Sequence, residues 1–432
     1  MLDLKALRED PDAFRAGLAR RGAADALDAV LALDGRVRAL KTQVEELRAE
    51  QNRASKEIGR AAPEERQARI DAGQALAAKL KEHEPELQRL QDELDGVLLR
   101  IPNVPHDSVP DGRDDDDNVL VKEVGTPTAF DFEPKDHLDL GGPLRLLDME
   151  RAARTSGSRF VYLMGPGVWL ELALVRYALD VLAGKGFIPM IPPVLVREEA
   201  MYGTGFLPTD ESQIYATRDD DLYLVGTSEV PLASFHQDEI LEASSLPVRY
   251  AGFSTCFRRE AGTYGKDTRG MFRVHQFDKV EMFSFCDPDR SWDEHEFLVS
   301  VEEELVTGLG IPYRLMNVCT GELGASAAKK IDLEAWFPGQ SKYRELTSCS
   351  NCTDYQARRL GVRVKGEREH RPVHTLNGTA CAVGRTLIAV LENHQLEDGS
   401  VELPEVLHNY LPRGLETLRP APRATGSASP GG

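Results

Sequence analysis

The chain has 432 residues, of which 41% are hydrophobic and 28% are charged, and its formal net charge at pH 7 is −19. This composition is typical of a folded, water-soluble protein, and apolar runs such as Val168 to Leu174 are far too short to cross a membrane. The negative net charge argues against a nucleic-acid partner unless the basic residues are grouped. The first residues contain no apolar signal segment, so we expect a cytoplasmic protein.

The N-terminal part of the chain is expected to be helical. The first 26 residues form a short lead-in, in which Asp10-Pro11 marks a helix start. Two stretches on either side of Pro63 then repeat apolar residues at alternating spacings of three and four, which predicts an antiparallel coiled-coil hairpin with limbs ~45 Å long. Pro85 is expected to kink the second limb or to mark an irregularity in it. The predicted seam positions are Leu33, Val37, Leu40, Val44, Leu47, Gln51, Ala54 and Ile58 in the first limb, and Leu76, Leu80, His83, Leu87, Leu90, Leu94, Val97 and Ile101 in the second.

The two limbs of this hairpin differ in charge. Residues 36–60 carry seven basic and four acidic side chains, whereas residues 64–100 carry six basic and nine acidic ones. Such charges suit two solvated helix faces, and they equally suit a basic stripe on the first limb that contacts an RNA backbone. The candidate RNA-contacting residues are Arg36, Arg38, Lys41, Arg48, Arg53 and Lys56.

Composition also indicates where the domains divide. Prolines and a run of aspartates predict a linker after the hairpin. We therefore expect a helical domain at 1–103, a linker at 104–118, a second domain at 119–416 and a disordered tail at 417–432, which is rich in Pro, Gly, Ala and Ser. In the second domain, strand-like and helix-like segments alternate without a β-α-β rhythm, which predicts an α+β fold with helices on an antiparallel sheet.

The six cysteines are scattered along the chain. Only Cys349 and Cys352 have the spacing of metal ligands, and a structural zinc site would need a second pair. We therefore expect reduced thiols and no zinc.

A charged hairpin is predicted in the middle of the second domain. Phe253–Phe257 and Val274–Phe285 are expected to be strands, and the loop between them is rich in glycine and basic residues. Arg258 and Glu260 are expected to share one face of the incoming strand, because side chains alternate along a strand. An arginine and a carboxylate beside a basic loop suit a polyphosphate attached to a base with an amino group, although an ordinary charged hairpin has the same pattern. The basic residues of the loop are Lys266, Arg269 and Arg273.

Other short segments place polar side chains next to turns. Gly226-Thr227-Ser228-Glu229 follows an expected strand, and Asn377-Gly378-Thr379 precedes Arg385 at an expected helix start. The segment Glu345-Leu346-Thr347-Ser348 offers hard oxygen ligands of the kind that Mg²⁺ prefers. Each segment alone is also compatible with a turn, a helix cap or a surface group.

Together these segments resemble the seryl-tRNA synthetases, a family of class II aminoacyl-tRNA synthetases, over essentially the whole chain. Phe257-Arg258-Arg259-Glu260 with the distal Phe277 resembles motif 2 of that class, and residues 374–387 resemble motif 3. The expected helix at 167–183, followed by Pro193, resembles motif 1, which forms a homodimer interface in that class. The resemblance implies a class II synthetase-like antiparallel sheet flanked by helices, and a homodimer.

The resemblance implies a two-step reaction. L-serine would be activated with ATP and Mg²⁺ to seryl-adenylate and then transferred to the 3′ end of tRNA(Ser), while charging of tRNA(Sec) stays open. Because the serine carboxylate attacks the α-phosphorus directly, the protein needs no nucleophile and contributes positioning and charge stabilisation.

The resemblance also assigns roles to individual residues. Arg258 would hold the α-phosphate and Arg385 the γ-phosphate, as the two catalytic residues. Phe277 would stack on adenine and Glu260 would accept its amino group. Further ATP contacts would come from Arg259, Val274, Leu346 and Thr347, with Mg²⁺ on Glu345 and Ser348. Serine would be bound at its ammonium by Thr227, Ser228 and Glu229, and at its hydroxyl by Glu281 and Thr379.

Two other classes of function share parts of this pattern. A related ligase could load serine onto a carrier protein, but a small acceptor would not need an arm ~45 Å long. A non-catalytic RNA-binding scaffold would be expected to have lost Arg258, Glu260, Glu345 or Arg385, and all four are present.

Overall fold

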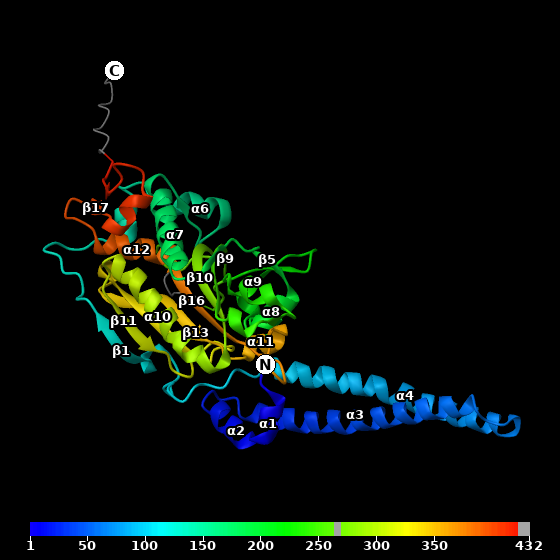
Figure 1. The fold of residues 1–432 in the computed structure, drawn as a ribbon. Helices are drawn as coiled ribbons and strands as arrows, with labels where there is room; N and C mark the ends of the chain where they lie inside the picture. Colours follow the sequence, from blue (N-terminus) through cyan, green and yellow to red (C-terminus); the bar gives the residue numbers. More distant parts are fainter. Residues whose placement is uncertain (263–268, 422–432) are drawn as a thin grey trace. The chain divides into compact units, whose positions relative to one another are not determined.

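The computed structural model describes residues 1–262 and 269–421. The chain forms two compact units, Met1–Val104 and Pro105–Gly432, and the break between them lies next to the boundary expected after residue 103 (Figure 1). Lys266 of the basic loop lies outside the described residues, as does the expected tail beyond residue 421. In the described ranges, no helix is long and apolar enough to span a membrane.

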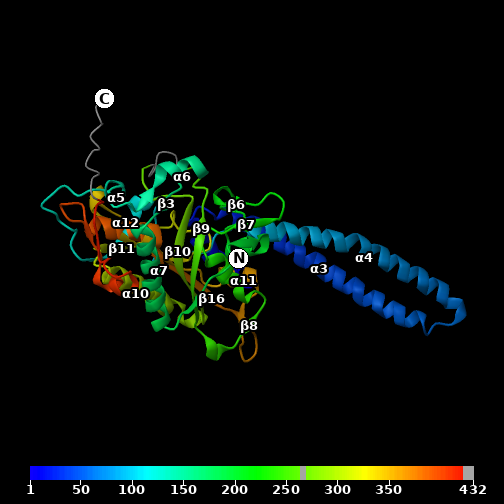
Figure 2. The same cartoon turned by 90° about the horizontal axis from the view of Figure 1, so that it is seen from above.

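The N-terminal unit consists of four helices. The lead-in contains α1 (Leu4–Glu9) and α2 (Pro11–Ala19), and the side chain of Asp10 accepts a hydrogen bond from the backbone N–H of Ala13 at the start of α2. The predicted helix start at Asp10-Pro11 is therefore confirmed. The long helices α3 (Asp25–Ile58) and α4 (Pro63–Leu98) lie side by side as the predicted hairpin (Figures 1 and 2). Pro85 lies inside α4, which continues through it.

The seam of the hairpin follows the predicted pattern. Every predicted seam position is buried or half-buried, whereas all six candidate RNA-contacting side chains are exposed. At the base, Val37 and Leu90 belong to a buried apolar cluster together with residues of the lead-in. Toward the tip, the last fully buried residue of α3 is Val44 and the first of α4 is Leu80. The hairpin is thus held by its seam, which thins toward the tip.

The second unit is built on an eight-stranded sheet with the order β1-β11-β12-β13-β16-β10-β9-β4. Neighbouring strands are antiparallel except β4 and β9, which are parallel. The predicted α+β fold is confirmed, but the sheet is not wholly antiparallel, because the chain crosses over between these two strands through α8 (Glu198–Thr204) and α9 (Glu229–Ala233). The strands are β1 (Val119–Val124), β4 (Ile188–Met190), β9 (Val248–Phe257), β10 (Gln276–Cys286), β11 (Tyr313–Asn317), β12 (Lys329–Phe337), β13 (Lys342–Asn351) and β16 (His374–Ala382).

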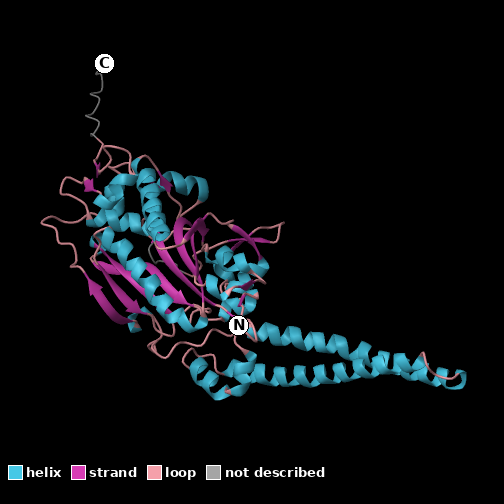
Figure 3. Cartoon of the chain, in the orientation of Figure 1, coloured by secondary structure: helices cyan, strands magenta, loops and turns pink. Residues whose placement is uncertain are grey.

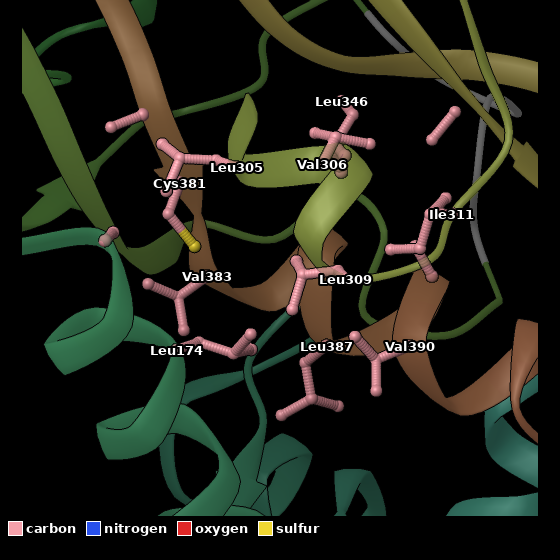
Figure 4. Close-up of a cluster of buried hydrophobic side chains, with 14 of the residues drawn as sticks. Leu174, Leu305, Val306, Leu309, Ile311, Leu346, Cys381, Val383, Leu387 and Val390 are labelled. Atoms are coloured by element: carbon pink, nitrogen blue, oxygen red, sulfur yellow. The ribbon is translucent and has the colours of Figure 1, made fainter. Parts of the chain in front are cut away.

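Three helices cover one face of this sheet: α7 (Pro166–Gly184), α10 (Ser291–Gly308) and α12 (Val383–Asn393) (Figure 3). Figure 4 shows part of the apolar core between them, to which Leu174 of α7, Val306 of α10, Leu387 of α12 and Cys381 of β16 contribute. Apolar residues therefore occupy the helix-covered face, and polar groups are left to the opposite face of the sheet.

Short elements complete the second unit. The helices are α5 (His137–Gly141), α6 (Met149–Ser156) and α11 (Tyr355–Leu360). The small sheets contain β2 (Leu147–Asp148), β3 (Tyr162–Leu163), β5 (Leu195–Arg197), β6 (Tyr215–Ala216), β7 (Leu222–Leu224), β8 (Ile240–Leu241), β14 (Arg363–Val364), β15 (Arg371–Pro372), β17 (Val401–Glu402) and β18 (Thr417–Leu418).

The end of the second unit corrects one prediction. The disordered tail was predicted from residue 417, but Thr417–Leu418 form β18 and pair with β17. Leu418 is buried in the main apolar core. Burial of this side chain outweighs the tendency of the proline-rich and alanine-rich composition to stay unfolded.

Candidate active site

A cavity of about 370 Å³ opens on the face of the sheet that the three helices leave uncovered. Phe277, Lys279 and Glu281 alternate along β10 and line this cavity. Val280 and Met282, which lie between and beyond them, belong instead to the helix-covered apolar core. The period-two alternation of β10 therefore separates a polar cavity wall from a packed core.

A β-bulge in β13 shapes the cavity wall. The register between β12 and β13 passes over Leu346, so that Glu345 pairs with Glu334 and Thr347 with Leu333. Residues three apart on a regular strand point to opposite faces, but the extra residue places Glu345 and Ser348 on the same face. Both residues line the cavity.

A second bulge acts in the same way in β16. The register between β10 and β16 passes over Ala380, so that Glu281 pairs with Thr379 and Val280 with Cys381. Glu281, Thr379 and Ala382 consequently share the cavity face, whereas Cys381 points to the core. The serine-hydroxyl residues proposed from the sequence are thus brought together by this register.

The incoming side of the charged hairpin differs from its prediction. Strand β9 ends at Phe257, and Glu260 has a left-handed φ of 51°, so Arg258 and Glu260 do not share a strand face as expected. Both nevertheless line the cavity. Arg258 Nε donates to the carbonyl oxygen of Gly226 at 3.1 Å, and its guanidinium carbon lies 5.3 Å from the centre of the Phe277 ring. The guanidinium group of Arg258 and the aromatic ring of Phe277 therefore lie next to each other in the cavity wall.

The returning side of the hairpin meets the start of α12. Strand β10 begins at Gln276, two residues later than predicted. Before it, Phe272 lines the cavity, and its carbonyl oxygen accepts a hydrogen bond from Arg385 Nε at 3.3 Å. Arg273 donates to Glu260 Oε2 at 2.5 Å, so the carboxylate proposed for the adenine amino group is already held by an arginine.

Glu345 lies against Arg385 and is open to the cavity. The side chain of Glu345 is 50% exposed, and its Oε2 lies 3.5 Å from an Arg385 nitrogen. Partial burial opposes the charged form, but Arg385, Lys330 and Arg258 outweigh it and lower the pKa of Glu345. Glu345 is therefore ionised at neutral pH, as a carboxylate that binds a metal ion must be.

Carboxylates dominate another part of the cavity. Glu229 Oε1 accepts hydrogen bonds from Gln356 at 2.7 Å and from Asn377 at 3.0 Å. Burial and the neighbouring carboxylate of Glu281 raise the pKa of Glu229 to about 7. Glu281 pairs with Lys279, and Thr379 donates to Glu281 Oε2 at 3.5 Å. The cavity therefore contains the Glu229 carboxyl group, whose pKa lies near neutrality, next to the ion pair of Lys279 with Glu281.

Twelve of the fifteen residues predicted to bind serine or ATP line the cavity: Thr227, Glu229, Arg258, Glu260, Val274, Phe277, Glu281, Glu345, Leu346, Ser348, Thr379 and Arg385. Ser228, Arg259 and Thr347 do not. Ser228 donates to the carbonyl of Gly252 at 3.2 Å, and Thr347 donates to Glu302 of α10 at 3.0 Å. Arg259 is exposed outside the cavity wall. Strand alternation explains Thr347, since neighbours on a strand cannot share a face.

The polar cavity residues that the sequence reasoning did not assign to the site include Lys279, Asn377 and Lys330. Lys279 alternates with Phe277 and Glu281 on a predicted strand, so period two would have found it. Asn377 alternates with Thr379 on β16, where the sequence analysis predicted no strand. Lys330 comes from β12, which carries none of the recognised segments, and only the pairing of β12 with β13 brings it to the cavity.

The two closely spaced cysteines are buried, and Cys352 Sγ lies 3.6 Å from both Ser326 Oγ and Asn377 Nδ2. Across residues 1–262 and 269–421, no group of three or more His, Cys, Asp and Glu side chains is arranged to hold a metal ion.

Known proteins resemble the chain in both units. Residues 1–105 match the model of the seryl-tRNA synthetase N-terminal domain, and residues 213–394 match that of the tRNA synthetase class II core domain (G, H, P, S and T). The serine--tRNA ligase 1 of Streptomyces avermitilis is 52% identical over 97% of this chain and 99% of its own, and that of Nocardia farcinica is 52% identical over 97% and 100%.

Solved structures show the same relationship. The seryl-tRNA synthetase of Pyrococcus horikoshii, complexed with ATP, is 43% identical with a TM-score of 0.91 and covers 98% of this chain and 100% of its own. The cytoplasmic serine-tRNA ligase of Naegleria fowleri, in complex with AMP, is 37% identical with a TM-score of 0.85 and covers 95% and 96%.

Proposed function

Because the chain belongs to the seryl-tRNA synthetase family, we propose that its cavity activates L-serine with ATP and that the enzyme then transfers the seryl group to tRNA(Ser). The family assignment rests on relatives that are 52% identical over 97% of the chain. The solved relatives in complex with ATP and AMP support a nucleotide in this cavity.

The position of Arg258 is the observation that carries the proposal. Arg258 lines the cavity beside Gly226, and its positive charge favours the ionised forms of both Glu345 and Glu229, although burial still leaves the pKa of Glu229 raised. Arg258 therefore lies between the carboxylate-rich part and the part that contains Arg385. An α-phosphate held by Arg258 would have the amino acid on one side and the leaving pyrophosphate on the other.

The chemistry then needs only positioning and charge. A carboxylate oxygen of serine forms the new bond to the α-phosphorus, and the bond from that phosphorus to the oxygen of pyrophosphate breaks. Arg258 would stabilise the charge on the α-phosphate oxygens, and Arg385 would hold the γ-phosphate. Phe277 would stack on adenine, with Glu260 and Val274 beside it. Arg273 donates to Glu260 and holds its carboxylate at the cavity wall, where the adenine amino group would lie.

Serine would occupy the carboxylate-rich part of the cavity. Glu229 and Thr227 would bind its ammonium group, and Glu281 and Thr379 would bind its hydroxyl group. The ion pair of Glu281 with Lys279 fixes that carboxylate in place. An amino acid without a hydroxyl would strand these buried polar groups, which can give discrimination of roughly 10⁴ or more.

Glu345 and Ser348 fit a Mg²⁺ ion that arrives with ATP. The bulge at Leu346 places both on the cavity face, and the carboxylate is ionised and half exposed. Mg²⁺ is commonly bound through one or two protein oxygens together with phosphate oxygens, so two ligands suffice. When bound, the ion would neutralise charge on the phosphates.

The hairpin would bind the tRNA. Its six candidate side chains are exposed, but Arg38 pairs with Asp34 at 3.0 Å and Arg48 pairs with Glu84 at 2.8 Å. RNA phosphates would replace these carboxylates as partners. Charging of tRNA(Sec) would use the same surface, and a charging assay with both tRNAs decides it.

A homodimer through the motif 1 region is supported by an apolar surface. The sheet ends at β4, and exposed apolar side chains gather on β4, the segment after it and the outer side of α7. Large exposed apolar patches are rare on monomers and mark interaction sites. These side chains are Val168, Trp169, Leu172, Ile188 and Ile191. A cytoplasmic location is proposed by analogy with the cytoplasmic serine-tRNA ligase of Naegleria fowleri.

Serine-dependent exchange of pyrophosphate into ATP tests the proposal. Exchange should be rapid with serine and slower by roughly 10⁴ with alanine and glycine, because neither offers a hydroxyl. Threonine should also be disfavoured, since its extra methyl must fit beside Glu281 and Thr379. A charging assay with tRNA(Ser) separates this enzyme from a carrier-loading ligase. Exchange that does not depend on serine would refute the proposal.

A further inference from the structure

His137 lies outside the cavity wall but is bonded to one of its backbone segments. The residue begins the short helix α5, where the side chain of Asp136 caps the next two amides at 2.9 Å each. His137 is only 4% exposed, and neither the family motifs nor the cavity includes it. A buried histidine with two specific partners calls for a physical reason.

The hydrogen bonds of His137 define its tautomer. The backbone N–H of Met271 donates to His137 Nε2 at 3.1 Å, and an amide nitrogen cannot accept, so Nε2 must be unprotonated. The proton of the neutral ring is therefore on Nδ1, which lies 3.2 Å from Glu392 Oε1. The same carboxylate also accepts the backbone N–H of His137 at 3.1 Å and that of Gly339 at 3.0 Å. Glu392 thus orients the ring, and the ring offers a lone pair to Met271.

The segment held by this lone pair forms part of the cavity wall. Met271, Phe272, Arg273 and Val274 all line the cavity. The neighbouring Gly270 has a φ of 85°, and a Cβ there would lie 2.2 Å from His137 Nε2. Glycine at this position is therefore required for the ring to approach the chain.

Two anchors of the segment are on the same helix. Arg385 near the start of α12 donates to the Phe272 carbonyl, and Glu392 near its end orients His137, which holds Met271. Seven residues separate Arg385 from Glu392, a rise of ~10 Å along the helix. Both ends of α12 therefore help to fix the position of the segment Met271–Val274.

We infer that His137, as the Nδ1-protonated tautomer oriented by Glu392, is a positioning residue for ATP, because it holds the Met271–Val274 wall of the nucleotide part of the cavity. The inference rests on the proposed function, since it assigns this wall to ATP. Serine binding, which would use Thr227 and Glu229 together with Glu281 of β10 and Thr379 of β16, should be almost independent of His137.

Three variants at this position separate positioning from packing. His137→Gln keeps an acceptor near the place of Nε2, whereas His137→Asn keeps a polar group only near the place of Nδ1. His137→Leu keeps neither. We expect KM for ATP in pyrophosphate exchange to rise about tenfold in His137→Leu and in His137→Asn, and to stay near the wild-type value in His137→Gln. KM for serine should stay within about threefold in all of them.

The control is a second histidine of the same unit. His408 Nε2 donates to the Leu403 carbonyl at 2.9 Å, away from the cavity, and His408→Leu should leave KM for ATP unchanged. Ring ¹⁵N shifts of His137 should show a protonated Nδ1 and an unprotonated Nε2.

The outcomes are distinguishable. The inference would be overturned if His137→Gln and His137→Asn changed KM for ATP equally, or if KM for ATP and KM for serine rose in parallel. A ring ¹⁵N shift that shows a protonated Nε2 would also overturn it. If His137→Leu does not fold, the comparison of Gln with Asn still decides. A wild-type enzyme without serine-dependent exchange would instead refute the proposed function.

Discussion

The arm (helices α3 and α4, residues 25–98) and the cavity of the second unit hold their charges in opposite ways. In the arm, ion pairs such as Arg48 with Glu84 are exposed, and the apolar seam supplies the stability. In the cavity, Glu229 and Glu281 are buried, and each is held by partners on other strands or helices. Removing a charged side chain from the arm should therefore cost little stability, whereas removing a buried charged side chain from the cavity should disturb the partners that it holds.

The largest expected effect comes from shortening the arm. Replacing residues 42–88 by a short Gly/Ser turn removes Arg48, Arg53 and Lys56 but keeps Val37 and Leu90 of the buried base. Seryl-tRNA formation should fall by about 10³, because contacts to RNA phosphates supply most of the affinity. Serine-dependent pyrophosphate exchange should stay within about threefold, since every cavity residue is in the second unit.

Both half-reactions of the shortened enzyme should be measured at several salt concentrations. An unchanged charging rate and KM for tRNA would show that the arm is not the tRNA-binding element. Loss of exchange in a folded protein would show instead that the arm influences the cavity.

The second effect concerns a single charge in the cavity. Arg258→Ala should lower serine-dependent exchange by ~10² to 10³, the range for removal of one preorganised donor. Thermal unfolding should change little, because the Arg258 side chain is only partly buried and, among the residues that the structure describes, donates one hydrogen bond, to Gly226. Arg259→Ala is the matched control: this neighbour is exposed and outside the cavity wall, so exchange should be nearly normal. Equal losses in the two variants would remove Arg258 from its role.

The third effect is a pH dependence of serine binding. The pKa of Glu229 is raised to about 7, so this carboxyl is largely neutral at pH 6 and largely charged at pH 8. Since the serine ammonium needs the charged form, KM for serine should fall about tenfold as pH rises across this range. In Glu229→Gln, KM for serine should be high and nearly independent of pH. A wild-type KM that is flat from pH 6 to 8 would contradict this assignment.

The smallest effect belongs to the arm surface. Arg48→Ala breaks the exposed pair with Glu84 and should change the free energy of unfolding by ~0.2 to 1 kcal/mol. KM for tRNA should rise by only a few fold, because one phosphate contact is a small share of the total. Glu84→Ala removes the same pair but leaves Arg48 for RNA, so its KM for tRNA should not rise. If both variants weaken charging equally, the pair matters for the hairpin rather than for RNA.

The sequence by itself determined the arm almost completely. Its seam from Leu33 to Ile101 follows from periodicity, because side-chain direction in a helix depends only on position along the helix. The sequence also identified the segments around Arg258, Glu281 and Arg385, because the sequence motifs of the family are short and contiguous.

Tertiary structure alone decided which members of those segments reach the cavity. The bulges at Leu346 and Ala380 bring Glu345 beside Ser348 and Thr379 beside Glu281, and they turn Thr347 toward Glu302. The approach of Lys330 and the bond from Met271 to His137 likewise join residues far apart in the chain. A shift of one residue in strand register exchanges the two faces of a sheet, and register is a property of paired strands that no single segment contains.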